Sequence, residues 1–221
     1  MKLPGLITIS SHQTELLRET ANMMGESFME ENWFITWLSA LDALGTTFER
    51  KLELIRAVFF DDLSVHAPYQ GAYVLEDKTA ACGGYLYSDM QGHTHSELEA
   101  KSGDALRAIA TKEELELLDS QNKKMEAISQ FDWAREHAKE QEHIYFYAWA
   151  VDKSARGTHA LTRLLKPFFT KADSEQINCY LECYADHLQS MYEHLGFELL
   201  DTLHDPQFEV YERRMVRYPQ K

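Results

Sequence analysis

Residues 151–165 (VDKSARGTHALTRLL) have the pattern of a strand end, a polar turn and the start of a helix, an arrangement that can hold a phosphate group. Such a turn exposes backbone N–H groups at the helix N-terminus, and these favour an anion such as pyrophosphate. Arg156 adds a guanidinium that can pair with a phosphate. At His159 and Leu161, however, side chains stand where glycine would permit the closest approach. Two interpretations follow: an altered turn that still binds a phosphate-bearing molecule, or a scaffold that has lost it.

The helix predicted after this turn is supported by its apolar spacing. Pro167 lies inside the pattern and is expected to kink or shorten the helix, because proline lacks the N–H that a helical hydrogen bond needs. Five apolar residues fall on one face at spacings of three and four: Leu161, Leu164, Leu165, Phe168 and Ala172.

A second segment with distinctive spacing lies downstream, at residues 181–200 (LECYADHLQSMYEHLGFELL). It predicts the end of a strand, followed by a helix that Gly196 closes. Together with residues 151–165, it resembles the paired signatures of the GNAT superfamily of N-acetyltransferases. Four residues fit the second signature: Tyr192, Glu193, Gly196 and Phe197.

The first signature matches only in part. His159 and Leu161 replace two small residues, and Lys153 replaces a proline. WAVD at 149–152 and SFMEENWFITWL at 27–38 also resemble the branch of the superfamily that acetylates small molecules. The residues that match in register are Val151, Arg156, Gly157 and Leu164.

The fold that this resemblance implies is a single α/β (α+β) domain over residues 1–221. It would contain a mixed, mostly antiparallel GNAT-like sheet of six or seven strands flanked by helices, with the fourth and fifth strands splayed to admit the cofactor. Residue patterns agree, since alternation and turn residues predict a hairpin within residues 71–89 with a bulge at Gly83 and Gly84. Further strands are predicted at 6–10, 143–152, 177–185, 197–205 and 208–217, and early helices at 14–30, 32–44 and 48–63.

A charged, helix-favouring segment spans about residues 96–142 and precedes the predicted fourth strand. We predict one to three helices there, as a helical insertion that covers the domain. Its apolar positions are sufficient for one packed face: Leu115, Leu118, Met125, Ile128, Phe131 and Trp133.

The activity that the resemblance implies is acetyl-CoA-dependent N-acetylation of a primary amine on a small molecule, by direct attack of the amine on the thioester. Two alternatives stay open: a non-catalytic binding or regulatory domain with impaired coenzyme A binding, and acetylation of a protein or peptide amine. The resemblance places the coenzyme A cradle at Trp149, Ala150, Val151, Arg156, Gly157, Thr158, His159, Ala160, Leu161 and Thr162.

The acid and the base are the remaining catalytic roles. Tyr192 falls where the superfamily places the tyrosine that protonates the departing thiolate, and a phenol with a pKa near about 10 carries its proton at neutral pH. The competing interpretation is core packing on an apolar helix face. Relatives often place the base at positions that Tyr145 and Tyr147 occupy here. Proton removal through water to Glu182 or Glu142 is then the open route, although Glu182 can equally be a structural partner of a neighbouring strand.

The formal net charge of −14 argues against binding to nucleic acids or anionic membranes, since such binding needs clustered Lys and Arg. It favours an amine-bearing substrate, although acidity for solubility alone is the competing interpretation. The sequence has no apolar run of about 18 residues. Its start does not resemble a signal peptide. A cytoplasmic location is therefore expected, and the resemblance adds a possible homodimer.

No metal centre is predicted. His93 and His95 in GHTH would need a third ligand that the sequence does not identify, so we interpret this segment as a solvated loop. The cysteines are expected to be reduced and mostly buried: Cys82, Cys179 and Cys183.

Overall fold

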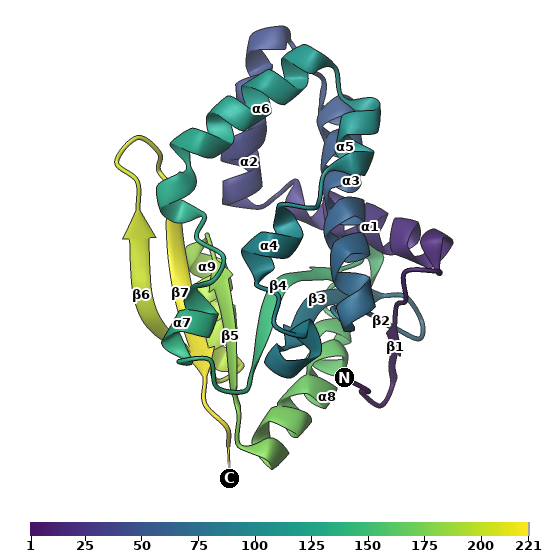
Figure 1. Cartoon of the computed structure of the whole chain (residues 1–221), viewed down its shortest axis with the longest axis vertical. Coiled ribbons are helices and arrows are strands. Elements are labelled where there is room, and N and C mark those ends of the chain that lie inside the picture. The colour runs from purple at the N-terminus through teal and green to yellow at the C-terminus, as the bar shows by residue number, and fades with distance from the viewer. Residues whose placement is uncertain (221) are drawn as a thin grey trace.

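The computed structural model describes residues 1–220, and a seven-stranded sheet runs through its centre (Figure 1). The strand order is β1-β2-β3-β4-β5-β7-β6, and every neighbouring pair is antiparallel except β4 and β5. This confirms the predicted mixed, mostly antiparallel sheet. The strands are β1 (Leu6–Thr8), β2 (Ala72–Leu75), β3 (Ala80–Leu86), β4 (His143–Val151), β5 (Asn178–Cys183), β6 (Glu198–His204) and β7 (Tyr211–Arg217).

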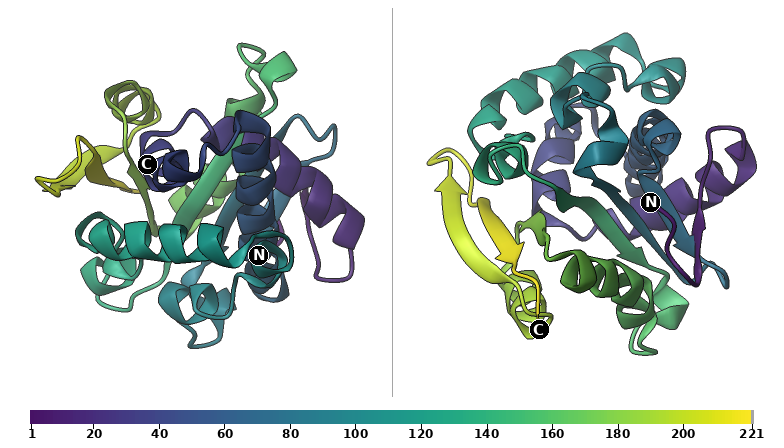
Figure 2. Two further views of the ribbon diagram at one scale, coloured as in Figure 1. Left: turned by 90° about the horizontal axis from the view of Figure 1, so that it is seen from above. Right: turned by 60° about the horizontal axis from the view of Figure 1, so that its bottom comes forward.

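Helices cover both faces of the sheet, because its central strands are apolar on both sides (Figure 2). Leu75 and Cys82 pack with α8 and α9, whereas Val74 and Ala81 pack with the early helices and α6. This alternation is the two-residue period of a strand. The helices are α1 (Thr14–Phe28), α2 (Asn32–Leu38), α3 (Phe48–His66), α4 (His95–Glu99), α5 (Asp104–Ile109), α6 (Lys112–Lys124), α7 (Trp133–His137), α8 (Ala160–Glu175) and α9 (Asp186–His194).

Strands β4 and β5 diverge, and this opens the sheet. β4 pairs with β3 as far as Val151, but its parallel pairing with β5 ends at Phe146 opposite Leu181. Residues 147–151 therefore leave one backbone edge without a strand partner. The predicted bulge of β3 is confirmed between Gly83 and Gly84. Glycine is required at Gly83, because a Cβ there would lie 2.3 Å from the ring of Tyr147.

Two predictions about helices can be compared with the structure, and the first is wrong. The segment 96–142 contains parts of four α-helices rather than one to three, because a left-handed Gly103 (φ +103°) and a 3₁₀ turn at Glu126–Ile128 interrupt the helical pattern. Pro167 does not shorten α8, which continues to Glu175. The proline lies on a partly exposed face of α8, where water can satisfy the carbonyl left without its helical donor.

Two further expectations concern membranes and thiols. Across residues 1–220, none of the helices combines the length and the apolar character needed to cross a membrane. Cys82, Cys179 and Cys183 are free and buried, as predicted.

Candidate functional site

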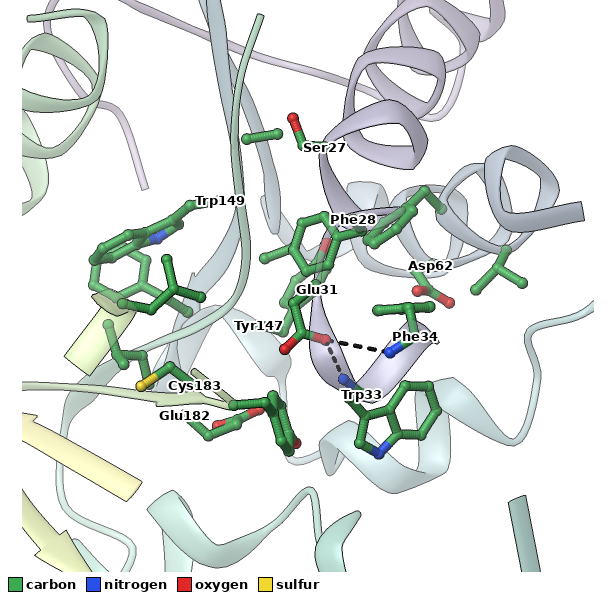
Figure 3. Close-up of a pocket in the computed structure, with 18 of the residues that line it drawn as sticks. Ser27, Phe28, Glu31, Trp33, Phe34, Asp62, Tyr147, Trp149, Glu182 and Cys183 are labelled. Carbon is green, nitrogen blue, oxygen red and sulfur yellow. Dashed lines mark hydrogen bonds between the residues drawn. The ribbon is translucent and has the colours of Figure 1, made fainter. Parts of the chain in front are cut away.

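A cavity of about 950 Å³ lies where β4 and β5 diverge, and its size suits a small-molecule ligand. One end is bounded by residues 146–151 of β4, the start of α8 and one face of α9. The other end reaches the early helices and the insertion, including Asp62 on α3 and Glu99 on α4. Figure 3 shows residues from several of these elements facing one space. The cavity therefore joins the predicted cofactor cradle to a region that sequence analysis left without a role.

The turn between β4 and α8 has a backbone suited to an anion. Gly157 (φ +80°) and His159 (φ +63°) are both left-handed, so His159 keeps the conformation that glycine favours although it carries a side chain. Ala160 and Leu161 follow in the first turn of α8, whose N–H groups have no acceptor inside the helix. Eight of the ten predicted cradle residues line the cavity: Trp149, Ala150, Val151, Arg156, Gly157, His159, Ala160 and Leu161.

The two remaining cradle residues lie outside the cavity lining. Thr158 and Thr162 are not among the residues that border it. The Thr158 hydroxyl instead donates to the backbone carbonyl of Ala155 at 2.6 Å and so closes the turn. The open edge of β4 and the free amides of α8 together fit a ligand with an amide-bearing arm and a pyrophosphate.

Basic side chains of the turn are already paired. Glu30, which lies between α1 and α2, accepts Arg156 Nη1 at 2.9 Å and Lys153 Nζ at 3.0 Å. These contacts hold the pKa of Glu30 below its usual value, with the Arg156 contact the larger cause. All three side chains are about half exposed, so the pairing is weak. Arg156 was expected to be available to a phosphate, and its pairing with Glu30 has no sign in the residue pattern.

Tyr192 on α9 lies beside the cavity among aromatic rings. Its ring meets that of Trp149 edge-on, with centroids 5.1 Å apart, and packs against Phe197 at 6.2 Å. Burial, followed by the nearby Cys183, raises the pKa of Tyr192 far above its ordinary value. The phenol therefore keeps its proton throughout the neutral range. The residue packs in the core and also borders the cavity, so the packing interpretation is confirmed and its role as the acid stays a prediction.

Glu182 on β5 borders the cavity, but both of its oxygens are engaged. Oε1 accepts the Tyr145 hydroxyl at 2.6 Å, and Oε2 accepts the Trp133 indole N–H at 3.2 Å. Burial raises the pKa of Glu182 to about 8. Glu142 lies elsewhere, on the surface, where it accepts the backbone N–H of Ser88 at 3.1 Å. The structure thus does not bring Glu142 to the cavity, and it gives Glu182 the structural contacts that sequence analysis kept as an alternative.

Glu31 is the functional candidate that sequence analysis missed. Its Oε2 accepts the N–H groups of Trp33 at 2.9 Å and Phe34 at 3.3 Å, which caps α2. Its Oε1 is buried and has no hydrogen-bond partner. Burial raises the pKa of Glu31 to about 7. Figure 3 shows this carboxylate among the side chains that line the cavity. A carboxylate that changes charge near neutral pH and has one free oxygen suits a general base.

Polar side chains gather at the other end of the cavity, and they overturn the interpretation of GHTH as a solvated loop. His95 is buried at the start of α4, because the capped turn at Thr94 directs it inward. Its Nδ1 lies 3.2 Å from His66 Nε2, and its Nε2 lies 3.6 Å from Glu99 Oε1. Burial lowers the pKa of His66 to about 4 and lowers that of His95 as well, so both rings are neutral.

The geometry of this histidine cluster does not suit a single metal ion. Ligand atoms of His66, His95 and Glu99 lie within 4.8 Å of one another. However, His66 and Glu99 face different nitrogens of the His95 ring, and a neutral imidazole offers a lone pair at only one of them. One ion cannot therefore meet all three ligands along their lone pairs. The arrangement fits a hydrogen-bonded chain, which His66 continues through Nδ1 to the carbonyl of Asp62 at 2.8 Å.

Comparison with solved structures identifies the fold, whereas no protein-family profile and no curated protein sequence matches the chain. An acetyltransferase from Corynebacterium glutamicum, described as histone acetyltransferase HPA2 and related acetyltransferase, aligns at TM-score 0.55 and 16% identity and covers 100% of this chain and 98% of its own. Arylalkylamine N-acetyltransferase 2 from Aedes aegypti aligns at TM-score 0.55 and 14% identity, and the alignment covers 97% of this chain and 98% of that one. A mutant agmatine N-acetyltransferase in its apo form aligns at TM-score 0.53 and 14% identity, and the alignment covers 96% of this chain and 98% of that one. With its diverging β4 and β5 strands and its glycine-poor turn before α8, the chain has the fold of the GNAT N-acetyltransferases.

Proposed function

We propose that this protein is an acetyl-CoA-dependent N-acetyltransferase that acts on a primary amine of a small molecule. The observation that carries the proposal is the buried, unpartnered Oε1 of Glu31, which faces the same cavity as Tyr192 and the open edge of β4. A core would not retain an unpaired carboxylate oxygen without cost. An ammonium group in the cavity would supply the missing partner.

The proposed reaction moves protons at both reacting atoms. Acetyl-CoA, when bound, would supply an acetyl thioester whose carbonyl carbon is open to attack by an amine. One C–N bond forms and one C–S bond breaks. An ammonium nitrogen loses two protons, one before the attack and one after it, and the sulfur gains one, so one proton is released to solvent. Glu31 accepts the proton of the ammonium at Oε1. Tyr192 holds, at its hydroxyl, the proton that the departing thiolate requires.

The chain's own backbone supports binding of the donor. Residues 147–151 of β4 offer an unpaired edge to an amide-bearing arm, and the first turn of α8 offers N–H groups to a pyrophosphate. Arg156 and Lys153 can add charge, provided that they leave Glu30. The proposed cradle therefore consists mainly of backbone groups, which replacement of glycine does not remove.

A second candidate function is a GNAT-like binding or regulatory domain without catalysis. The specific observation in its favour is the pairing of Glu30 with both basic residues of the turn, together with the side chain at His159. If these features exclude the donor, the cavity would bind an amine without acetylating it. Acetylation of a protein or peptide amine has no comparable observation in its favour.

A turnover assay tests the proposal. Purified protein would be incubated with acetyl-CoA and a panel of alkylamines, diamines and arylalkylamines, with detection of free thiol and of the acetylated amine by mass spectrometry. The proposal predicts stoichiometric thiol and acetylamine for at least one amine. No product from any amine, combined with a thermal midpoint that acetyl-CoA does not raise, would contradict it and favour the domain that has lost its donor. A raised midpoint without product would contradict catalysis on these amines but would show that the donor still binds.

A further inference from the structure

The cavity ends, on the side of the early helices, at two carboxyl groups that lack a cationic partner. Asp62 on α3 and Glu99 on α4 both border this end, and their side chains interact with each other. Asp62 Oδ1 also accepts the Ser102 hydroxyl at 3.3 Å. Across residues 1–220, neither carboxylate forms an ion pair with a lysine or an arginine. Two carboxyl groups therefore face the cavity without a cationic partner among the described residues.

The neighbouring side chains do not relieve this charge. His95 lies beside Glu99, but burial lowers the pKa of His95, so the ring stays neutral. The Asp61 carboxylate accepts hydrogen bonds from the N–H groups of Ala105 at 2.9 Å and Leu106 at 3.0 Å, at the start of α5. Burial raises the pKa of Glu99 to about 7, as expected when two carboxyl groups share a buried site. A cation from outside the chain would allow both to ionise.

Aromatic rings form the walls between this acidic end and Glu31. Trp33 and Phe34 on α2 lie edge to face with centroids 5.0 Å apart, and Tyr147 on β4 borders the same space. In Figure 3, Glu31 is seen between Trp149 and Asp62. Aromatic faces attract cations and also exclude water from around them. The cavity is thus a passage with an unpaired carboxylate oxygen at Glu31 and a second anionic group at its end.

We infer that the acceptor is a dication: an amine whose reacting nitrogen meets Glu31 while a second ammonium or guanidinium group binds Asp62 and Glu99. This inference rests on the proposed function, because it assigns the substrate class of the same cavity. It makes Asp62 and Glu99 specificity-determining residues rather than structural ones. The two groups would select for a second positive charge and for its distance from the reacting amine.

The test compares diamines with monoamines of equal chain length. Initial rates with acetyl-CoA would be measured for 1,4-diaminobutane, 1,5-diaminopentane and agmatine against butylamine and pentylamine. The inference predicts a kcat/KM for the best dication at least about tenfold above that of its monoamine. Asp62→Asn and Glu99→Gln should each shrink this ratio, chiefly through a higher KM for the dication. Glu116→Gln, which neutralises an exposed carboxylate on α6, should leave the ratio unchanged.

A binding measurement keeps the inference testable if no amine is acetylated. Calorimetric titration of the protein with 1,5-diaminopentane alone should show saturable binding that Asp62→Asn weakens and Glu116→Gln does not. Equal kcat/KM for diamines and monoamines would overturn the inference and leave the proposed function intact. Absence of diamine binding, or binding of Zn²⁺ but not of the diamine, would overturn it as well. Thermal midpoints of the variants would show that each is folded.

Discussion

The two ends of the cavity differ in how the chain builds them. The end proposed to hold the donor comes mainly from consecutive residues, since β4, the turn and the start of α8 supply the proposed cradle between 147 and 162, and α9 adds Tyr192 beside it. The acceptor end is assembled from Glu31, Asp62 and Glu99, which belong to three separate helical regions. Backbone groups dominate the first end and carboxylates dominate the second. Under the proposed function, a local segment holds the common donor, whereas distant side chains determine which acceptor enters.

The largest expected effect concerns Glu31 at the acceptor end. Glu31→Gln removes the group that accepts the ammonium proton but preserves the side-chain oxygen that caps α2. We expect kcat/KM for the amine to fall by about 100-fold or more, since general base catalysis contributes at least that much. Steady-state rates at pH 7.5 measure it. A variant with near wild-type rates and an unchanged thermal midpoint would exclude Glu31 as the base.

A smaller effect is expected at the donor end for Tyr192→Phe. The substitution removes the hydroxyl but keeps the ring that packs on Trp149. We expect kcat to fall by about tenfold or more, because the thiolate must then take its proton from water. The rise in thermal midpoint caused by acetyl-CoA should persist. If kcat is unchanged, Tyr192 is a packing residue only, and its match to the superfamily signature has no catalytic meaning here.

The link between the two ends is Glu30, directly before Glu31 in sequence. Glu30→Gln breaks the pairs with Lys153 and Arg156 and frees both for a phosphate. We expect acetyl-CoA to bind about threefold more tightly, a modest gain because the pairs are half exposed. Arg156→Ala should weaken the binding of acetyl-CoA. Titration calorimetry distinguishes the outcomes, and weaker binding in Glu30→Gln would mean that Glu30 supports the turn instead of competing for it.

The smallest expected effect is a pH dependence of stability. Burial raises the pKa of Glu182 to about 8 from an ordinary value of 4.5, so the folded protein retains a proton that the unfolded chain releases. Stability should therefore fall as the pH rises from about 4.5 to about 8. Between these two pH values, the thermal midpoint of Glu182→Gln should fall less than that of the wild type, and the difference between the two proteins should be a few degrees. Glu116→Gln, which changes an exposed carboxylate, is the control, and its midpoint should vary with pH as that of the wild type does. Identical curves of midpoint against pH for all three proteins would contradict a raised pKa of Glu182.

The donor end was predictable from sequence because its evidence is local. Gly157 and Tyr192 sit in short patterns with fixed spacing, and the apolar period of α8 is visible in consecutive residues. The alternation of β4 likewise indicated the strand that carries the cradle. The pairing of Arg156 with Glu30 could not be predicted, since it joins residues 126 positions apart.

The acceptor end was not predictable, because its residues have no common motif. Glu31 could have been suspected from its place at the start of α2, beside Phe28 and Trp33, where an acidic residue enters apolar surroundings. His95 was assigned to solvent because its partner His66 lies on another helix. The sequence gives no sign that α3 and α4 pack so closely. Such contacts depend on tertiary packing, which residue spacing does not encode.

The pH dependence of kcat/KM for an alkylamine tests the central claim most directly. If ionised Glu31 takes a proton from the ammonium form, the wild-type profile should rise to about pH 7 and then level off below the amine pKa of about 10. Glu31→Gln must instead bind the free amine, so its lower rates should keep rising up to pH 9. Parallel profiles for the two proteins would contradict the assignment of Glu31 as the base.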